Sequence, residues 1–397
     1  MIYIFNPDHD LAIADFSPYY TPPASIVKMM GDLAVLPLWY SDGHPVVADG
    51  EQNMHYFEHI KRLLPIKSTL ISSDDIINYD GVGIAPWGWN PLIRNKLLKM
   101  GVTENELPST EYLEKLRGYS NRLHAVEMFE ILHVESDKFT GESHYFTNID
   151  DVLKYLSSTI GNKVLKMPVS GSGRGLIWIL GEITDKQTDW CRRVIKKQGG
   201  VVAEPVFDKV LDFALEFEIR SGNIEFIGYS LFKTASSGAY SGNYLISDGA
   251  IEQRLSSYIP ISLLHHVREL VQQNLSSRFF DYSGYVGVDM MICRDINDSV
   301  VEYKIHPCVE INLRMNMGIV SQIIYNNFIE PGSEGCYSVE YFKKEASALV
   351  FHEKMQREKP LIIENGKVVS GYLALTPVTP ATHYVAFVLC TTHPGNF

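Results

Sequence analysis

Short β-forming runs alternate with helix-like stretches over the first hundred residues, and this alternation constrains the fold more than any other feature of the sequence. Strands that alternate with helices are typical of an α/β domain built on a parallel sheet. We therefore expect an α/β domain at the N-terminus. The β-forming runs are Ile2–Phe5, Val46–Ala48, Thr69–Ser72 and Val82–Ala85, and the helix-like stretches include Tyr56–Leu64 and Leu92–Met100.

The pattern changes near Val164, where closely spaced β-forming runs replace the alternation. Glycine-containing turns separate several of these runs, so the sequence predicts an antiparallel sheet in a second, α+β part of the molecule. The predicted strands are Val164–Lys166, Leu176–Leu180, Val201–Glu204, Asp212–Arg220, Ile224–Leu231, Gly284–Cys293 and Val309–Asn312.

Helical periodicity predicts further helices at Thr110–Leu116, Ser120–Leu132, Ile261–Phe279 and Val339–Arg357. Ser120 is a candidate N-cap, because a serine hydroxyl accepts a backbone N–H at a helix start. The tail Gly371–Cys390 contains two prolines and favours an edge strand, because proline cannot donate to a sheet ladder.

Composition and charge exclude several classes of protein. The chain has 397 residues, 45% of them apolar and 21% charged, and we expect two or three packed units around a sizeable core. The 35 Lys and Arg against 47 Asp and Glu give a net charge of −12 without a basic run, which disfavours a nucleic-acid partner. The start does not read as a signal peptide and no apolar run is long enough for a bilayer, so we expect a soluble cytoplasmic protein with no membrane partner. Five cysteines without a C-x-x-C motif disfavour a disulfide framework and structural zinc.

A lysine and a glycine-rich loop follow one another at Lys166 and Ser170–Gly175. Glycines let backbone N–H groups approach phosphate oxygens, and a lysine supplies a positive charge for the same oxygens. The order differs from a Walker A loop, in which the lysine follows the glycines, and the glycine spacing differs from a dinucleotide-binding fingerprint. Taken alone, the segment is equally compatible with a hairpin turn.

Two oxygen-bearing side chains, Glu310 and Asn312, stand two residues apart in a predicted strand. Side chains at this spacing point to one face of a sheet, and hard oxygen donors suit Mg²⁺. Asp289 would complete the site if its strand were the neighbour. The interval of 310 − 289 = 21 residues exceeds a plain hairpin, so we expect a loop around 294–299 to take up the excess. The alternative interpretation is a solvated strand face that bears two polar residues.

The order of these segments resembles that of the ATP-grasp superfamily. A strand with a lysine, a glycine loop, a hinge at Val201–Phe207, an acidic residue in the next strand, Gly-x-Asp at 287–289 and Glu-x-Asn-x-Arg at 310–314 follow in the family's order. The resemblance covers about residues 122–318. It implies a fold of the α/β and α+β classes, with an N-terminal α/β pre-ATP-grasp domain before a two-lobed ATP-grasp core. The implied segments are 1–117 for the N-terminal domain, 118–200 for lobe 1 with the phosphate loop, 201–325 for lobe 2 with the metal site, and 326–397 for a C-terminal helix and edge strand packed on the core.

The resemblance also implies roles for individual residues. The residues that would bind ATP are Arg122, Lys166, Ser170, Gly171, Ser172, Gly173, Arg174, Gly175, Glu204, Val206 and Asp212. The residues that would bind Mg²⁺, or Mn²⁺ in its place, are Asp289, Glu310 and Asn312. Lys166 and Arg314 would act in catalysis, the first on the phosphates and the second on the transferred phosphoryl group.

The reaction that the resemblance implies joins a small-molecule or peptide carboxylate to an amine, or to another nucleophile. It would pass through an acyl phosphate and release ADP and phosphate. Two alternatives stay open, a small-molecule kinase on the same fold and a catalytically silent nucleotide-binding regulatory protein. A dehydrogenase is disfavoured, because no dinucleotide fingerprint follows Phe5. The sequence names neither substrate, leaves a homodimer open and gives no firm role to Asn6–Asp10.

Overall fold

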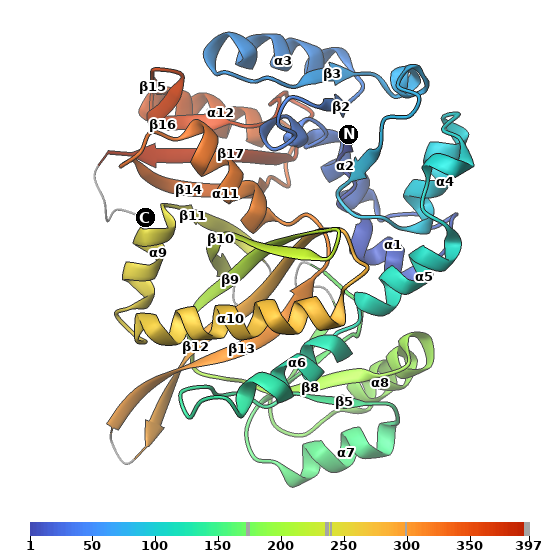
Figure 1. Cartoon of the computed structure of the whole chain (residues 1–397), viewed down its shortest axis with the longest axis vertical. Helices are drawn as coiled ribbons and strands as arrows, with labels where there is room; N and C mark the ends of the chain where they lie inside the picture. The colour runs from blue at the N-terminus through green and yellow to red at the C-terminus, as the bar shows by residue number, and fades with distance from the viewer. Residues whose placement is uncertain (172–174, 235–237, 239, 298–299, 393–397) are drawn as a thin grey trace. The chain divides into compact units, whose positions relative to one another are not determined.

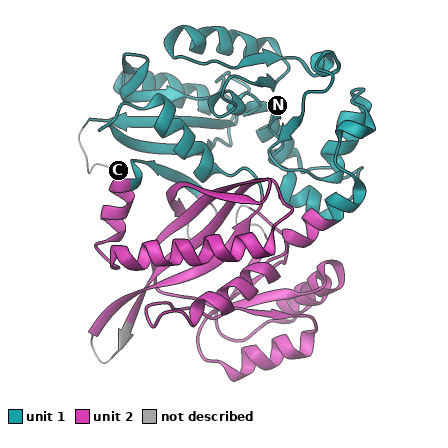
Figure 2. Cartoon of the chain, viewed as in Figure 1, with its two compact units in different colours: residues 1–114, 241–248, 314–397 teal, residues 115–240, 249–313 magenta. Residues whose placement is uncertain are grey.

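The computed structural model describes residues 1–171, 175–234, 238, 240–297 and 300–392 (Figure 1). The chain forms two compact units (Figure 2), unit 1 with residues 1–114, 241–248 and 314–397 and unit 2 with residues 115–240 and 249–313. The chain therefore passes between the units at 114/115, 240/241, 248/249 and 313/314. The segment boundaries that we expect at 117/118, 200/201 and 325/326 stay predictions.

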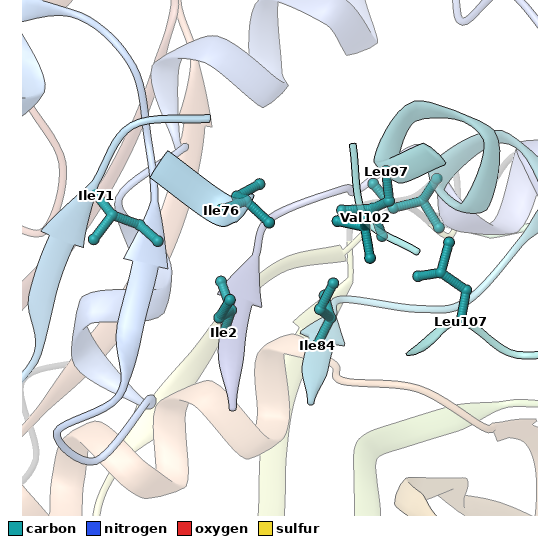
Figure 3. Close-up of a cluster of buried hydrophobic side chains, with 8 residues drawn as sticks. Ile2, Ile71, Ile76, Ile84, Leu97, Val102 and Leu107 are labelled. Carbon is teal, nitrogen blue, oxygen red and sulfur yellow. The ribbon is translucent and has the colours of Figure 1, made fainter. Parts of the chain in front are cut away.

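Unit 1 begins with a four-stranded sheet in the order β3-β2-β1-β4, and every pair in it is parallel. The predicted parallel sheet of the N-terminal α/β region is thus confirmed. Apolar side chains from the sheet and from the following helix share a core, in which Ile2 and Ile84 lie with Leu97 (Figure 3). The strands are β1 (Ile2–Ile4), β2 (Pro45–Val47), β3 (Thr69–Ile71) and β4 (Ile84–Pro86).

Local capping chemistry explains where the helix after β4 begins. The Asn90 Oδ1 accepts the backbone N–H of Ile93 at 3.0 Å, and Pro91 occupies the first helical position, where its missing N–H costs nothing. The helices of this N-terminal region are α1 (His9–Asp15), α2 (Ala24–Asp32), α3 (Glu51–Leu63), α4 (Pro91–Lys99) and α5 (Thr110–Tyr119), the last of which continues into unit 2.

The C-terminal part of unit 1 is an antiparallel sheet in the order β11-β14-β17-β16-β15. Its strands are β11 (Tyr240–Leu245), β14 (Glu334–Tyr341), β15 (Ile362–Glu364), β16 (Lys367–Ala374) and β17 (Tyr384–Thr391), and its helices are α11 (Met317–Phe328) and α12 (Ser347–Glu358).

Two predictions for the C-terminal segment are wrong. The expected edge strand Gly371–Cys390 is two strands, and β17 lies inside the sheet between β14 and β16. Pro377 and Pro380 lie in the connection between β16 and β17, so neither interrupts a ladder. The expected helix Val339–Arg357 starts late, because residues 339–341 belong to β14 and pair with β17, and α12 begins only at Ser347.

Unit 2 contains a small antiparallel sheet in the order β5-β8-β6-β7, covered by two helices with which it shares an apolar core. The second helix starts with a capping box at Thr184 and Gln187 and ends at Gly199, whose φ of +86° suits the left-handed C-cap. The elements are β5 (His144–Phe146), α7 (Ile149–Ser158), β6 (Lys163–Lys166), β7 (Leu176–Ile179), α8 (Asp185–Gln198) and β8 (Val201–Pro205).

The larger sheet of unit 2 is antiparallel in the order β13-β12-β9-β10. The long helix α10 packs against β10 through a buried apolar stripe, and its Arg268 lies over the ring of Phe226, which contacts Phe217 of β9. One face of the sheet is thus an apolar core beneath α10. The elements are β9 (Lys209–Arg220), β10 (Asn223–Thr234), α9 (Asp248–Leu255), α10 (Ile261–Arg278), β12 (Gly284–Asn297) and β13 (Val300–Asn312).

The helix that leads into unit 2, α6 (Leu123–His133), does not use the predicted cap. The Ser120 hydroxyl donates to the Leu116 carbonyl at 2.8 Å and so closes the end of α5, while Arg122 takes the N-cap position of α6. Among the described residues, no helix is long and apolar enough to cross a membrane.

Candidate functional site

Strand register brings the predicted acidic residues of unit 2 to one face of the larger sheet. Asp289 of β12 lies opposite Glu310 of β13 on one side and opposite Ala214 of β9 on the other. Directly opposed residues share a face, and so do residues two apart in a strand. Asp212, Asp289, Glu310 and Asn312 therefore lie on the same face, and Phe213 and Phe217 lie on the opposite face, towards α10.

Asp289 and Asn312 are in contact, since the Asn312 Nδ2 donates to the Asp289 Oδ2 at 3.2 Å. The expected loop at 294–299 is wrong, because β12 continues to Asn297 and β13 starts at Val300. A long hairpin takes up the interval instead, and an irregularity between Asp289 and Met291 keeps the register.

The donor set on this face fits a hard divalent cation. Two carboxylates and one amide oxygen, from Asp289, Glu310 and Asn312, are the ligand types that Mg²⁺ takes in proteins. In the part of the chain that the structure describes, no group of three or more His, Cys, Asp and Glu side chains is arranged to hold a metal ion. A cation at this face would therefore depend on the Asn312 amide and on water for its remaining ligands.

Lys166 and Glu204 form a buried ion pair between the neighbouring strands β6 and β8. The Lys166 Nζ lies 2.5 Å from the Glu204 Oε2, and both side chains are less than a tenth exposed. The Ser143 hydroxyl donates to the other carboxylate oxygen at 3.0 Å. Burial acts to raise the pKa of Glu204, but the charge of the Lys166 ammonium and the hydrogen bonds from Lys166 and Ser143 outweigh it and hold that pKa below its usual range. Glu204 is thus an anion with a matched cation.

Arg122 connects the start of the glycine-rich loop to β13. Its Nη1 donates to the Ser170 hydroxyl at 2.8 Å and to the Met167 carbonyl at 2.5 Å, while its Nη2 lies 2.6 Å from the Glu310 Oε1. The Arg122 side chain is 7% exposed, so the guanidinium depends on these partners. Its Nε has no hydrogen-bond partner among the described residues.

Gly175, at the end of the glycine-rich loop, has a backbone conformation that favours glycine. Gly175 has a φ of +75°, and a Cβ there would lie 2.8 Å from the Ser170 Cβ, so only glycine suits this position. Ser170 and Gly171 are buried. The predicted loop residues Ser172, Gly173 and Arg174 lie outside the described residues.

Asp212 and Val206, two further residues predicted to bind ATP, make the following contacts. The Asp212 Oδ2 lies 2.5 Å from the Lys209 Nζ and accepts from the Thr234 hydroxyl at 2.7 Å. Val206 is 41% exposed, and its backbone N–H donates to the Asn162 carbonyl at 2.9 Å.

Arg314 belongs to unit 1, where it makes a two-point ion pair with Asp10. The Nε lies 2.6 Å from Oδ1 and the Nη2 lies 2.7 Å from Oδ2, the fork geometry that arginine favours with carboxylates. The neighbouring His9 is buried, and burial lowers its pKa to about 4, so its ring is neutral at pH 7.

A separate cavity of about 370 Å³ opens in unit 1 between α2, α3 and the segment 377–382. Lys28, Asp32, Asn53 and Thr382 are among its lining residues. It contains none of the predicted site residues.

Among comparisons with known proteins, the one with solved structures identifies the fold. No family model matches the sequence, and no curated protein matches it. Among solved structures, biotin carboxylase from Campylobacter jejuni, in a complex described as β-γ-ATP, is 12% identical with a TM-score of 0.50. The match covers 98% of this chain and 86% of that one. Biotin carboxylase is an ATP-grasp enzyme.

The chain has an ATP-grasp fold. An N5-carboxyaminoimidazole synthetase from Staphylococcus aureus and an N5-carboxyaminoimidazole ribonucleotide synthetase from Thermus thermophilus match as well, each with a TM-score of 0.48. The Staphylococcus aureus enzyme is 13% identical, with 99% of this chain and 93% of that one covered, and the Thermus thermophilus enzyme is 12% identical, with 99% and 94% covered. At these identities the likeness concerns the fold alone. The fold predicted from the order of the motifs is confirmed, and the roles of individual residues stay predictions.

Two buried polar residues on the strands that hold the predicted metal ligands and Asp212 were not predicted as site residues. Glu216 lies in β9 four residues after Asp212, so it shares the polar face, and it is 1% exposed. The alternation of Asp212, Ala214 and Glu216 in one strand was the available signal. His306 of β13 is fully buried, stacked on Phe129, and neither ring nitrogen has a hydrogen-bond partner among the described residues.

Proposed function

We propose that this chain is an ATP-dependent ligase that joins a carboxylate to an amine or to another nucleophile and releases ADP and phosphate. One observation carries the proposal: on an ATP-grasp fold, Asp289, Glu310 and Asn312 share one sheet face, and the buried Arg122 joins that face to the start of the glycine-rich loop. Oxygen ligands beside fixed cations are what phosphoryl transfer requires.

In this proposal each side chain acts by charge and position. Mg²⁺ would be held by Asp289, Glu310 and Asn312, where it would neutralise charge on the phosphates. Lys166 and Arg122 would supply fixed positive charge to the phosphate oxygens. Glu204 and the backbone at Val206 would orient the adenine, and Asp212 would accept from the ribose hydroxyls.

Activation of a carboxylate explains the use of ATP. Transfer of the γ-phosphoryl group to a carboxylate oxygen gives an acyl phosphate, and attack by an amine then releases phosphate, a far better leaving group than hydroxide. We assign Arg314, which already binds one carboxylate at two points, to the transferred group or the acyl phosphate. A lysine there would present a single charged point and hold such a group less firmly.

The test is a screen of carboxylate and amine pools for ATP consumption, with products resolved by mass spectrometry. The proposal predicts ADP and free phosphate in equal amounts with a condensed product, and a hydroxamate when hydroxylamine replaces the amine. A stable phosphorylated product without free phosphate would replace the ligase by the kinase alternative. AMP with pyrophosphate would overturn the acyl-phosphate route.

A further inference from the structure

The cations proposed for nucleotide phosphate in unit 2 are both engaged by carboxylates. Lys166 pairs with Glu204 at 2.5 Å, and Arg122 pairs with Glu310 at 2.6 Å. The two pairs differ in one respect. Glu204 lies in β8 and is assigned to the base, whereas Glu310 lies in β13 and is a proposed metal ligand.

The Arg122–Glu310 pair therefore joins two ligand sites through one bond. Glu310 cannot give its full charge to a metal while it neutralises Arg122, and Arg122 cannot give its full charge to phosphate while it holds Glu310. Burial makes the conflict costly, because an ion that loses its partner in a buried site stays uncompensated. The Arg122 side chain is 7% exposed and the Glu310 side chain is 26% exposed.

Arg122 and Glu310 can separate without leaving an unpaired charge only when a divalent cation and a nucleotide phosphate bind together. A divalent cation takes over Glu310, and a phosphate oxygen takes over Arg122, so each group exchanges one counter-charge for another. A cation alone leaves Arg122 without its anion, and a metal-free nucleotide leaves Glu310 without its cation.

We propose that the Arg122–Glu310 ion pair is a charge-exchange latch, which disfavours a metal without nucleotide and a nucleotide without metal. This inference rests on the proposed function. The contacts of Arg122 with Met167 and Ser170 extend the latch to the start of the glycine-rich loop.

The latch predicts that one variant, Arg122→Gln, binds Mn²⁺ more tightly and ATP with Mg²⁺ more weakly than the wild-type protein. Arg122→Gln frees Glu310 from its cation, so Mn²⁺ alone binds more tightly, on the order of tenfold to a hundredfold. The same variant binds ATP with Mg²⁺ more weakly, because a phosphate contact is lost. If the role of Arg122 is purely structural, the variant should bind both Mn²⁺ and ATP more weakly. Mn²⁺ binding is measured by the loss of the free-ion signal in electron paramagnetic resonance, and ATP binding by calorimetry.

The reciprocal variant tests the other half of the latch. Glu310→Gln removes the competitor for Arg122, so ATP in EDTA binds more tightly than to the wild-type protein, while the gain in ATP affinity on adding Mg²⁺ shrinks. This variant keeps the shape of the side chain, and it decides the matter independently if Arg122→Gln fails to fold.

Two controls separate the latch from general loss of charge. Lys166→Met removes a cation that pairs with Glu204, so it weakens ATP binding without tightening Mn²⁺ binding. Arg122→Lys keeps the charge, so Mn²⁺ alone stays as weakly bound as in the wild-type protein.

The failure of the latch differs from the failure of the proposed function. If the wild-type protein binds ATP with Mg²⁺ but Arg122→Gln leaves Mn²⁺ affinity unchanged or lower, the latch is overturned and the nucleotide site stands. If the wild-type protein binds no ATP in the presence of Mg²⁺ at any concentration tested, the proposed function falls and the latch falls with it.

Discussion

At the scale of single residues, three ion pairs set the cost of substitutions among the proposed site residues. The pairs that matter for the proposed chemistry are Lys166 with Glu204, Arg122 with Glu310, and Arg314 with Asp10. Breaking a buried pair by removing one member costs about 3–5 kcal/mol, whereas replacing both members by neutral groups is often tolerated. A loss of ligand binding must therefore be separated from a loss of stability.

We expect Lys166→Met to lower the free energy of unfolding, because Glu204 stays buried without its cation. The double variant Lys166→Met with Glu204→Gln should recover most of that stability. Its ATP affinity should stay about tenfold to a hundredfold below that of the wild-type protein, since the phosphate contact is still missing. Urea unfolding and calorimetry on both variants measure the two effects. ATP affinity at the wild-type level in a folded double variant would show that Lys166 does not contact phosphate.

We expect the buried His306 to make the free energy of unfolding depend on pH. Burial lowers the pKa of its ring from 6.5 to about 4 in the folded protein. Between these values the unfolded chain binds a proton that the folded chain does not, so the free energy of unfolding falls as the pH falls, by up to about 1.4 kcal/mol per pH unit. His306→Leu should remove this part of the slope between pH 6.5 and pH 4.

Urea unfolding of wild-type and variant protein at neutral pH and near the lower end of that window measures the slope. His266→Gln, a change at an exposed position of α10, is the matched control and should leave the slope as it is in the wild-type protein. An equal slope in His306→Leu and wild-type protein would contradict the prediction.

The sequence predicts which nearby residues share a face of a strand. It does not predict which distant residues form ion pairs. Glu310 and Asn312 are two apart in one strand, so their common face follows from the period of a strand. The bond from Arg122 to Glu310 spans 188 residues, and nothing in either segment indicates it. The same holds for the Asp10 partner of Arg314, which lies 304 residues away.

At the scale of elements, close backbone approach explains why β16 contains a glycine. Gly371 has a φ of +97°, and a Cβ there would lie 2.1 Å from the Pro360 carbonyl oxygen. We expect Gly371→Ala to destabilise the protein by at least about 1–3 kcal/mol, since the backbone conformation alone costs that much for alanine. Thermal unfolding measures the change.

Gly31 is the matched control for this substitution. It is exposed in α2, and no atom lies within 4 Å of the position that a Cβ would take there, so Gly31→Ala should stabilise the protein by about 0.5–1 kcal/mol. An unchanged melting temperature in Gly371→Ala would mean that β16 shifts away from Pro360 without cost.

Elements with a strong local pattern were predictable, and elements defined by distant pairing were not. The strands β6, β8 and β9 and the helix α10 follow the predicted runs closely, because alternation or a long apolar stripe marks them. The start of the region 339–357 was taken for helix, but Val339 lies opposite Ala386 of β17. Spacing within the segment does not reveal a partner strand that lies about fifty residues away.

At the scale of the whole molecule, unit 1 is built from both ends of the chain. Its parallel sheet comes from the first 86 residues, and its antiparallel strands come from residues 241 onward. Buried and partly buried hydrogen bonds join the two parts. The Trp39 indole N–H donates to the Leu375 carbonyl at 2.7 Å, and the Asp32 carboxylate accepts the backbone N–H groups of His383 and Tyr384 at 2.9 and 3.0 Å.

We therefore expect deletion of residues 326–397 to destabilise the N-terminal α/β region as well as to remove the C-terminal strands. The deletion leaves the Trp39 N–H and the Asp32 carboxylate without these partners, and each unsatisfied buried group costs about 1–3 kcal/mol. Hydrogen exchange should then be fast in α2, in α3 and around Trp39. Trp39→Phe in the full chain removes one donor and keeps an aromatic ring, so it should cost about 1 kcal/mol and leave that protection in place. Wild-type protection of residues 24–63 in the truncated chain would show that the N-terminal α/β region folds without the C-terminal strands.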